Sequence, residues 1–200
     1  EISLAPMMEC SDRHYRYLMR LITQKTKLYT EMVVADDLLK KDDSSRYLLL
    51  GSSNIEHPVA LQLGGSDPQA LANATLESLK YFPFDEINLN CGCPSHIVAN
   101  SAKQFGARLM HNPELVRQCV SEMSRVASGV PVTVKCRLGT NERSGYENLC
   151  RFISAVSNDS GVRHFVVHAR ECVLEGLSPK QNRSVPPLRP RWVHRLQQDF

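Results

Sequence analysis

The stretch Asp85-Glu86-Ile87-Asn88-Leu89-Asn90-Cys91-Gly92-Cys93-Pro94-Ser95 decides how the rest of the chain is interpreted. Its first half alternates between apolar and polar residues, which is the period of a β-strand whose successive side chains point to opposite faces. Gly92 and Pro94 then end the strand, because neither residue sits comfortably inside a central ladder. The pattern therefore places Cys93 in a turn just past the carboxyl end of a strand, where a thiol is a candidate nucleophile or proton donor.

Strand and helix patterns alternate along the whole chain. Period-two patterns predict strands at 2–6, 28–34, 58–63, 86–90, 131–137 and 163–168. Helical patterns lie between them at 12–22, 36–50 and 145–156, after the N-cap and proline pairs at 67–68 and 112–113, and from 191 onward beyond a proline-rich loop. Such alternation predicts parallel strands joined by right-handed crossovers.

The parity of the polar residues distinguishes two architectures, a doubly wound sheet and a (β/α)8 barrel. A sheet covered by helices on both faces should be apolar on both faces. Here the strands are apolar on one face only, and polar residues share the other parity: Gln62, Asn88, Asn90, Lys135, Arg137, His168 and Arg170. This favours the α/β class and a (β/α)8 TIM barrel with a polar inner mouth, although hydrogen-bonded polar groups in an ordinary core remain the alternative.

The length of the chain limits how much of a barrel it can form. A complete barrel of this kind needs about 250 residues, whereas this chain has 200 and about six of the eight β/α units. We therefore expect residues 1–200 to form an incomplete barrel domain. An open variant of the fold is the alternative, but it would leave two parallel edges unpaired.

Composition places the chain among ordinary globular domains, with 42% hydrophobic and 22% charged residues. Its net charge of +3 permits a nucleic-acid partner without requiring one. Seven cysteines, an odd number, favour a reducing compartment, so we expect a cytoplasmic protein, or an organellar one if a targeting peptide was removed. We expect no membrane span, since no apolar run is long enough, and no metal site, since Cys91 and Cys93 are too closely spaced for structural zinc.

The segment 88–95 resembles the signature of the tRNA-dihydrouridine synthases, flavoenzymes that reduce uridine in tRNA. Further blocks of that family appear in its order: Ala5–Met8, Leu28–Met32, Gln62–Gly65, Phe105–Ala107, Val134–Arg137 and His168–Arg170. Gly176–Arg183 followed by Pro186–Leu188 is similar to the A-type bacterial subfamily, whose targets are uridines of the tRNA D-loop. Together these blocks extend the resemblance over nearly the whole chain.

The resemblance implies an FMN-binding TIM barrel, followed in the family by a C-terminal helical tRNA-binding domain that this chain would lack. The implied reaction reduces uridine to 5,6-dihydrouridine in the D-loop, of the position 20/20a class, with NADPH as the reductant. Hydride would pass from the flavin to C6 of uracil, and Cys93 would donate the proton to C5.

The resemblance also implies roles for the polar residues of the inner face. The residues implied to contact the flavin are Pro6, Met7, Gln62, Lys135 and His168. Those implied to contact the uracil are Asn90, Lys135 and Arg137. Inward cations also favour an anionic or carbonyl-rich ligand on physical grounds, because an unpaired buried charge is costly. An ion-paired Lys135, a His168 satisfied in the core and a structural Cys93 are the alternatives.

The segment from residue 170 to 200 carries six lysines and arginines against three acids. Of these, Arg170, Lys180 and Arg183 are candidates to contact tRNA phosphates, with a solvated charged surface as the alternative. Two other functions stay open at this stage. One is another FMN barrel that acts on a small molecule, such as a dihydroorotate or ene-reductase, and the other is a non-catalytic tRNA-binding barrel remnant.

Overall fold

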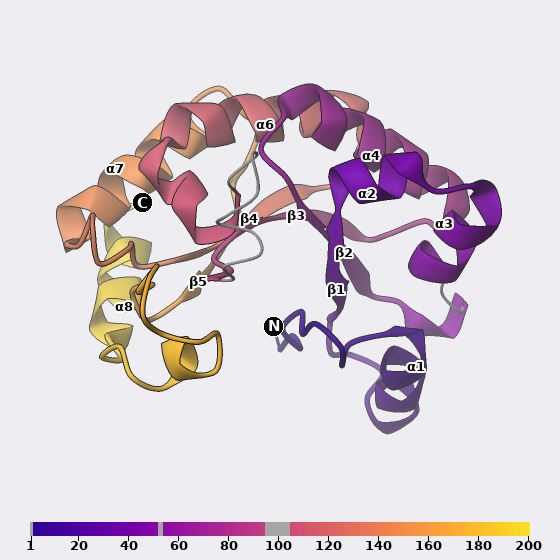
Figure 1. Ribbon diagram of the computed structural model, residues 1–200, viewed down its shortest axis with the longest axis horizontal. Coiled ribbons are helices and arrows are strands. Elements are labelled where there is room, and N and C mark those ends of the chain that lie inside the picture. Colours follow the sequence, from indigo (N-terminus) through magenta and orange to yellow (C-terminus); the bar gives the residue numbers. More distant parts are fainter. Residues whose placement is uncertain (1, 52–53, 95–104) are drawn as a thin grey trace.

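The computed structural model describes residues 2–51, 54–94 and 105–200 (Figure 1). Its described strands form a five-stranded sheet in the order β1-β2-β3-β4-β5, in which each strand pairs in parallel with the next one in sequence. Their bounds are β1 Leu28–Val34, β2 Val59–Gly64, β3 Glu86–Cys91, β4 Val132–Arg137 and β5 Phe165–His168. Sequential parallel order of this kind is that of a (β/α)8 barrel, so the structure confirms the α/β fold class and shows part of a barrel.

Helices follow the outside of a C-shaped arc of strands (Figure 1). The α-helices are α1 Arg13–Ile22, α2 Ala35–Lys40, α3 Asp43–Leu50, α4 Pro68–Tyr81, α6 Pro113–Val126, α7 Tyr146–Ser157 and α8 Pro190–Asp199. Short 3-10 helices are η1 Asn54–Glu56, η2 Gly106–His111 and η3 Gln181–Arg183. Because α2, α4, α6 and α7 pack side by side along the arc, they cover the convex face of the sheet.

Two helices on the convex side begin as the sequence predicts. The Asp67 carboxylate accepts hydrogen bonds from the backbone N–H groups of Gln69 and Ala70, and Pro68 occupies the first helical position of α4. The Asn112 side chain caps α6 in the same way, by accepting from the N–H of Leu115. These caps satisfy N–H groups that have no partner inside the helix.

The hydrophobic core lies between the convex face of the sheet and the helices. Outward side chains of the strands are completely buried there: Leu61, Leu63, Ile87, Leu89, Val134 and Cys136. They pack against apolar side chains of the helices, including Leu71 of α4 and Val116, Val120 and Met123 of α6. Since burying one such side chain contributes roughly 1.5–3 kcal/mol, this layer supplies most of the stability, and the concave face is left for polar groups.

Two sequence predictions are corrected by the structure. The predicted strand 2–6 is reduced to a single parallel bridge between Ser3 and Lys27, since Pro6 has no N–H to continue a ladder. The predicted helix 36–50 is two helices, because the Asp42 side chain caps a new helix by accepting from the N–H of Ser45. Smaller differences are strand starts at 59, 132 and 165 and a start of α8 at Pro190.

Replacement of Leu89 tests how much of the stability comes from the core between the convex face of the sheet and the helices. Leu89→Ala should lower the free energy of unfolding by about 2–5 kcal/mol, because it removes a buried side chain and leaves a cavity. Leu76→Ala is the matched control, since Leu76 lies on α4 with 46% of its surface exposed. Chemical denaturation of both variants measures the difference, and equal losses would show that the layer contributes no more than surface contacts.

Candidate active site

The concave face brings together polar side chains from four neighbouring strands. The strand registers pair Gln62 with Asn88, Asn90 with Lys135, and Arg137 with His168. Since residues opposite each other in a ladder point to the same face, these side chains share the face that the helices do not cover. The sequence prediction that Gln62, Asn90, Lys135 and His168 lie on one side of the sheet is therefore confirmed.

Cys93 lies in a turn directly after β3 and is half-buried. The Asn90 side-chain oxygen accepts hydrogen bonds from the backbone N–H groups of Gly92, at 3.0 Å, and Cys93, at 2.9 Å. The Cys93 carbonyl accepts a third bond from the N–H of Ala107 at the start of η2. These bonds hold the backbone of the turn, so the position of the thiol is set by its own strand and by η2.

Cys91, two residues earlier, is completely buried on the convex side. Burial raises the pKa of its thiol well above the ordinary value, so Cys91 stays protonated and inaccessible at neutral pH. The prediction that Cys91 belongs to the core is confirmed. The seven cysteines, all within the described ranges, form no disulfide.

Lys135 lies opposite Asn90, whose side chain holds the Cys93 turn. Burial lowers the pKa of its ammonium group, and the nearby cation of Arg137 acts in the same direction. Within residues 2–51, 54–94 and 105–200, no carboxylate forms an ion pair with Lys135. The alternative of an ion-paired Lys135 therefore finds no support among the described residues. A ligand with carbonyl oxygens or negative charge suits this position.

Arg137 has a structural task that the sequence did not suggest. Only 3% of the residue is exposed, and its guanidinium donates to three backbone carbonyls, those of Gly92, Glu171 and Asn182. It therefore joins the Cys93 turn to the two loop segments that follow β5. A uracil contact by Arg137 stays a prediction, and it would have to use what these bonds leave of the guanidinium.

His168 ends β5 and is surrounded by cations. Burial lowers the pKa of its imidazole to about 4, and the charges of four basic residues add to the shift: Arg137, Lys135, Arg170 and Arg183. At neutral pH the ring is accordingly uncharged, with one nitrogen as a donor and the other as an acceptor. A neutral donor–acceptor pair suits the edge of a heterocycle better than it suits a phosphate.

Gln62 lies deeper than the other predicted ligands, with 1% of its surface exposed. Its amide nitrogen donates to Asn88, and its amide oxygen accepts from Asn90, both at 2.8 Å. One N–H and one lone pair of the amide remain for a ligand. Gln62 therefore belongs to the floor of the site rather than to its rim.

The N-terminal segment approaches the sheet beside β1. Its backbone exchanges hydrogen bonds with Lys27 through Ile2 and Leu4, and the half-buried Pro6 and Met7 follow. The Met7 carbonyl accepts from the N–H groups of Cys10 and Ser11, which forms a turn before α1. The predicted packing of Pro6 and Met7 under a flavin ring stays a prediction.

The basic residues beyond β5 divide into two groups. Arg189 lies over the ring of Trp192 and Arg195 over the ring of Tyr146, so these two contribute to the packing of α8 and α7. Arg170 donates to the carbonyl of Pro186, whereas Lys180 and Arg183 are exposed. Of the three predicted tRNA contacts, Arg170 and Arg183 lie close enough to affect His168, so these two belong to the mouth of the site.

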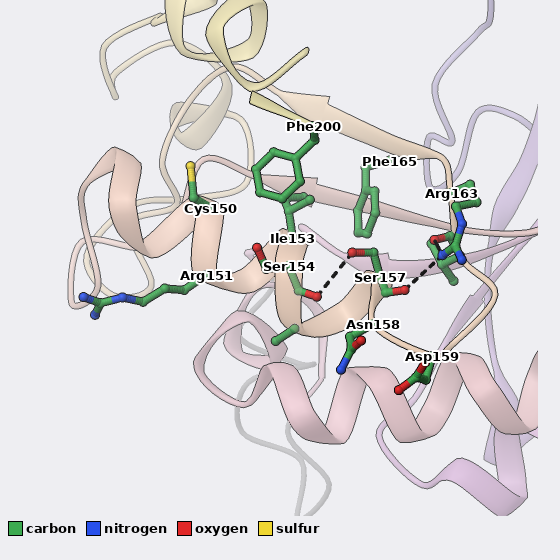
Figure 2. A pocket seen from close by; sticks show the side chains of 12 residues that line it. Cys150, Arg151, Ile153, Ser154, Ser157, Asn158, Asp159, Arg163, Phe165 and Phe200 are labelled. Atoms are coloured by element: carbon green, nitrogen blue, oxygen red, sulfur yellow. Dashed lines mark hydrogen bonds between the residues drawn. The ribbon is translucent and has the colours of Figure 1, made fainter. Parts of the chain in front are cut away.

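A cavity of about 990 Å³ lies away from these groups, between α7, the start of β5 and the C-terminal residue. Figure 2 shows Ile153, Phe165 and Phe200 lining it, together with the hydroxyl groups of Ser154 and Ser157. Phe165 belongs to the outward parity of β5 and lies at its amino end. Active sites of (β/α)8 barrels lie at the carboxyl ends of the strands, so this cavity is not the catalytic site.

Two features are absent from residues 2–51, 54–94 and 105–200. These residues contain no group of three or more His, Cys, Asp or Glu side chains that could hold a metal ion. None of their helices is both long and apolar enough to cross a membrane.

Sequence reasoning missed the residues that support the site from below and from the side. Glu86 and Thr133 are both buried and hydrogen-bonded to each other on the concave face. Asn182 is completely buried, and its side chain bonds to the backbone of Val173, Leu177 and Ser178, which fixes the loop after β5. The parity of β4 places Thr133 on the inner face with Lys135 and Arg137, and the same rule locates Glu86, but parity does not show that the two support the site. No sequence pattern marks Asn182.

A parallel arc of strands with amides, cations and a thiol at their carboxyl ends defines part of a (β/α)8 barrel with a candidate active site. The sequence profile of the dihydrouridine synthase family matches residues 3–200, and the chain belongs to that family.

Curated relatives agree with this assignment. The chain is 50% identical over 198 residues to the tRNA-dihydrouridine(20/20a) synthase of Xylella fastidiosa strain 9a5c, which covers 99% of the chain and 56% of that protein. It is also 50% identical to the proteins of the same name from Synechocystis sp., over 100% of the chain and 57% of the relative, and from Escherichia coli K12, over 99% and 55%. The chain thus spans a little over half of the length of these relatives.

The depressed pKa of His168 predicts a specific pH dependence of stability. The folded-state pKa of about 4 lies below the ordinary value of 6.5, so the unfolded chain binds more protons between these values. The contribution of the neutral His168 ring to the free energy of unfolding should therefore be fully present above pH 6.5 and decrease as the pH falls toward 4. His168→Gln should flatten this part of the profile in urea denaturation, whereas His14→Gln, at an exposed position of α1, should not.

Proposed function

We propose that the protein to which this chain belongs reduces uridine to 5,6-dihydrouridine in the D-loop of tRNA, at the position 20/20a class of sites. The observation that carries the proposal is the placement of Cys93 on a fixed turn beside Asn90 and Lys135, at the carboxyl ends of parallel strands. Membership of the dihydrouridine synthase family and the names of the relatives support the same reaction.

The described residues fit a flavin, and we propose FMN as the cofactor and NADPH as the reductant. Lys135 has a cation without a carboxylate among the described side chains, His168 offers a neutral ring, and Gln62 has one donor and one acceptor to spare. A flavin has carbonyl oxygens and ring nitrogens that such groups can bind. When bound in reduced form, it supplies the hydride that reaches C6 of uracil.

Cys93 is proposed as the catalytic acid, with its proton passing from Sγ to C5 of the uracil as the C5–C6 double bond is reduced. A thiol is suited to this task by its residue type, because its reference pKa of about 8.5 lets it carry a proton and release it to substrate near neutral pH. Asn90 holds the turn that presents this thiol and lies opposite Lys135. This position supports the proposal that both contact the uracil edge. Arg137 is proposed to contact the uracil as well, beyond its bonds to the backbone.

The substrate uracil has to leave its stack inside folded tRNA in order to reach a thiol on the concave face. Arg170, Lys180 and Arg183 are proposed to contact the phosphates around it, since they lie on the segment beyond the carboxyl end of β5. The compartment we propose is the cytoplasm. The helical tRNA-binding domain known from the family would lie beyond these 200 residues.

The two other functions left open by the sequence are tested by simple measurements. A flavin absorbance spectrum of the purified full-length protein would be absent for a non-catalytic barrel remnant. A small-molecule reductase would instead oxidise NADPH with dihydroorotate or an enone and ignore tRNA. Dihydrouridine formation in unmodified tRNA, without turnover of those small substrates, is the outcome that we expect.

Replacement of Cys93 tests the proposed catalytic acid in the full-length protein. Cys93→Ala should still bind flavin and be reduced by NADPH at a near-normal rate, because the thiol is needed only for protonation of the substrate. Dihydrouridine formation should fall by about two to four orders of magnitude, which is the usual contribution of a general acid. Cys93→Ser should restore little activity, because a hydroxyl has a much higher pKa than a thiol.

Cys91→Ala is the matched control, since Cys91 is buried in the core two residues away. It should cost stability and leave most of the activity. The choice of thiol is wrong if Cys91→Ala abolishes the product while Cys93→Ala does not.

Replacement of Lys135 tests the proposed flavin site through the affinity for FMN alone, without a measurement of activity. Lys135→Met keeps the length of the side chain and removes the charge, so the Kd for FMN should rise roughly 10- to 100-fold, the value of one charge-assisted hydrogen bond. Lys80→Met on α4, where Lys80 pairs with Glu77, should leave the Kd unchanged. Titration of flavin fluorescence measures both, and an unchanged Kd for Lys135→Met would remove Lys135 from the cofactor site.

A further inference from the structure

A continuous chain of hydrogen bonds crosses the concave face from one strand to the next. The Asn90 amide donates to Gln62, and the Gln62 amide donates to Asn88, each at 2.8 Å. Asn88 donates at 2.8 Å to the hydroxyl of Thr133, which in turn donates at 2.6 Å to a carboxylate oxygen of Glu86. All of the bonds point in one direction, from the Cys93 turn toward Glu86.

The two ends of the chain fix this direction. At one end, the carboxylate of Glu86 can only accept hydrogen bonds, so the Thr133 hydroxyl has to donate to it. At the other end, the backbone N–H groups of Gly92 and Cys93 can only donate, so Asn90 has to present its amide oxygen to them. The three amides between these ends therefore have a single orientation that satisfies every bond.

Glu86 is itself held firmly at the floor of the concave face. It is 2% exposed, and three groups donate to its carboxylate: the Lys27 ammonium, the Tyr29 hydroxyl and the Thr133 hydroxyl, at 2.8, 2.8 and 2.6 Å. These bonds compensate for the removal of the charge from water. The carboxylate is therefore a fixed acceptor from which the orientation of the chain can be set.

We propose that Glu86 is a positioning residue for Cys93, acting through the orientation of the amides of Asn88, Gln62 and Asn90. Its negative charge sets the orientation of these amides, and the last of them fixes the turn that presents the thiol. The same orientation determines which amide groups of Gln62 and Asn90 face a ligand. The effect on the orientation of the turn stands by itself, whereas the consequence for catalysis rests on the proposed function.

Glu86→Gln changes one acceptor into a donor at nearly constant shape. If the new amide places its nitrogen toward Thr133, the Thr133 hydroxyl loses its acceptor. It can regain one by donating to Asn88, but that reverses the row of hydrogen bonds and turns the NH2 group of Asn90 toward the N–H of Cys93. If it places its nitrogen toward Lys27 instead, two donors face each other there. Lys27→Met removes that opposing donor, so the double variant can keep an oxygen toward Thr133 and restore the original orientation.

The experiment uses the full-length protein with variants Glu86→Gln, Lys27→Met, their combination, and Glu56→Gln as a control. Glu56 is a buried carboxylate paired with Arg16 at 2.8 Å, and it takes no part in the row of hydrogen bonds from Asn90 to Glu86. Its replacement should therefore lower the stability without changing the Cys93 turn. The primary readout is the rate of amide hydrogen exchange at Gly92 and Cys93, which is monitored by NMR without added flavin. Melting temperature and dihydrouridine formation are measured in parallel.

Glu86→Gln should speed exchange at these two amides about tenfold, the loss of one ordinary hydrogen bond, whereas the other strand amides change less. The double variant should return exchange to near the value of Lys27→Met alone. Equal loosening in Glu86→Gln and Glu56→Gln, or no rescue in the double variant, would overturn the proposal and leave Glu86 a structural residue. Rescued exchange in the double variant with unchanged product formation in every variant would keep Glu86 as a positioning residue of the turn and refute its consequence for catalysis, whereas the proposed role of Cys93 fails only if Cys93→Ala keeps its activity.

Discussion

The constraint on which the rest of the structure depends is that polar groups buried on the concave face must be paired with one another. Glu86, Asn88 and Thr133 are each 2% exposed or less, so none of them can rely on water. An unpaired buried polar group costs about 1–3 kcal/mol, and more when it is charged. The strands can therefore keep polar side chains inside an arc only if their register brings donors opposite acceptors, as it does for Asn88 and Thr133.

This constraint divides the sheet into two faces with different tasks. The convex face carries Leu61, Ile87 and Leu89, whose burial against the helices stabilises the fold and involves no chemistry. On the concave face, the pairing of the charged groups differs between the floor and the mouth. Glu86 is fully paired at the floor, whereas Lys135 at the mouth has no carboxylate partner among the described residues. A paired floor keeps the groups at the mouth in place, and their remaining bonding capacity is available to a ligand.

Much of this arrangement could be predicted from the sequence because it depends on periodicity. Alternation in residues 86–91 and the caps at Asp67 and Asn112 are local signals, and the structure contains both features. Contacts between distant segments could not be predicted. Arg137 has the inward parity of a ligand-binding cation, yet three backbone carbonyls occupy it, because the loop after β5 folds back over β4. Periodicity gives the face on which a side chain lies but not which partner reaches it first.

The electrostatics of the mouth restrict the kind of molecule that it can accept. Lys135, Arg137, Arg170 and Arg183 gather around His168, and their charges together with burial keep that imidazole neutral. Repulsion among these cations is relieved when a ligand brings in carbonyl oxygens or negative charge. A ligand rich in such groups therefore stabilises the mouth as it binds, while a neutral hydrocarbon of the same size would leave the cations unpaired and desolvated. Flavin, uracil and the phosphates of tRNA all meet this requirement, so one set of charges can favour the cofactor and the substrate of the proposed reaction.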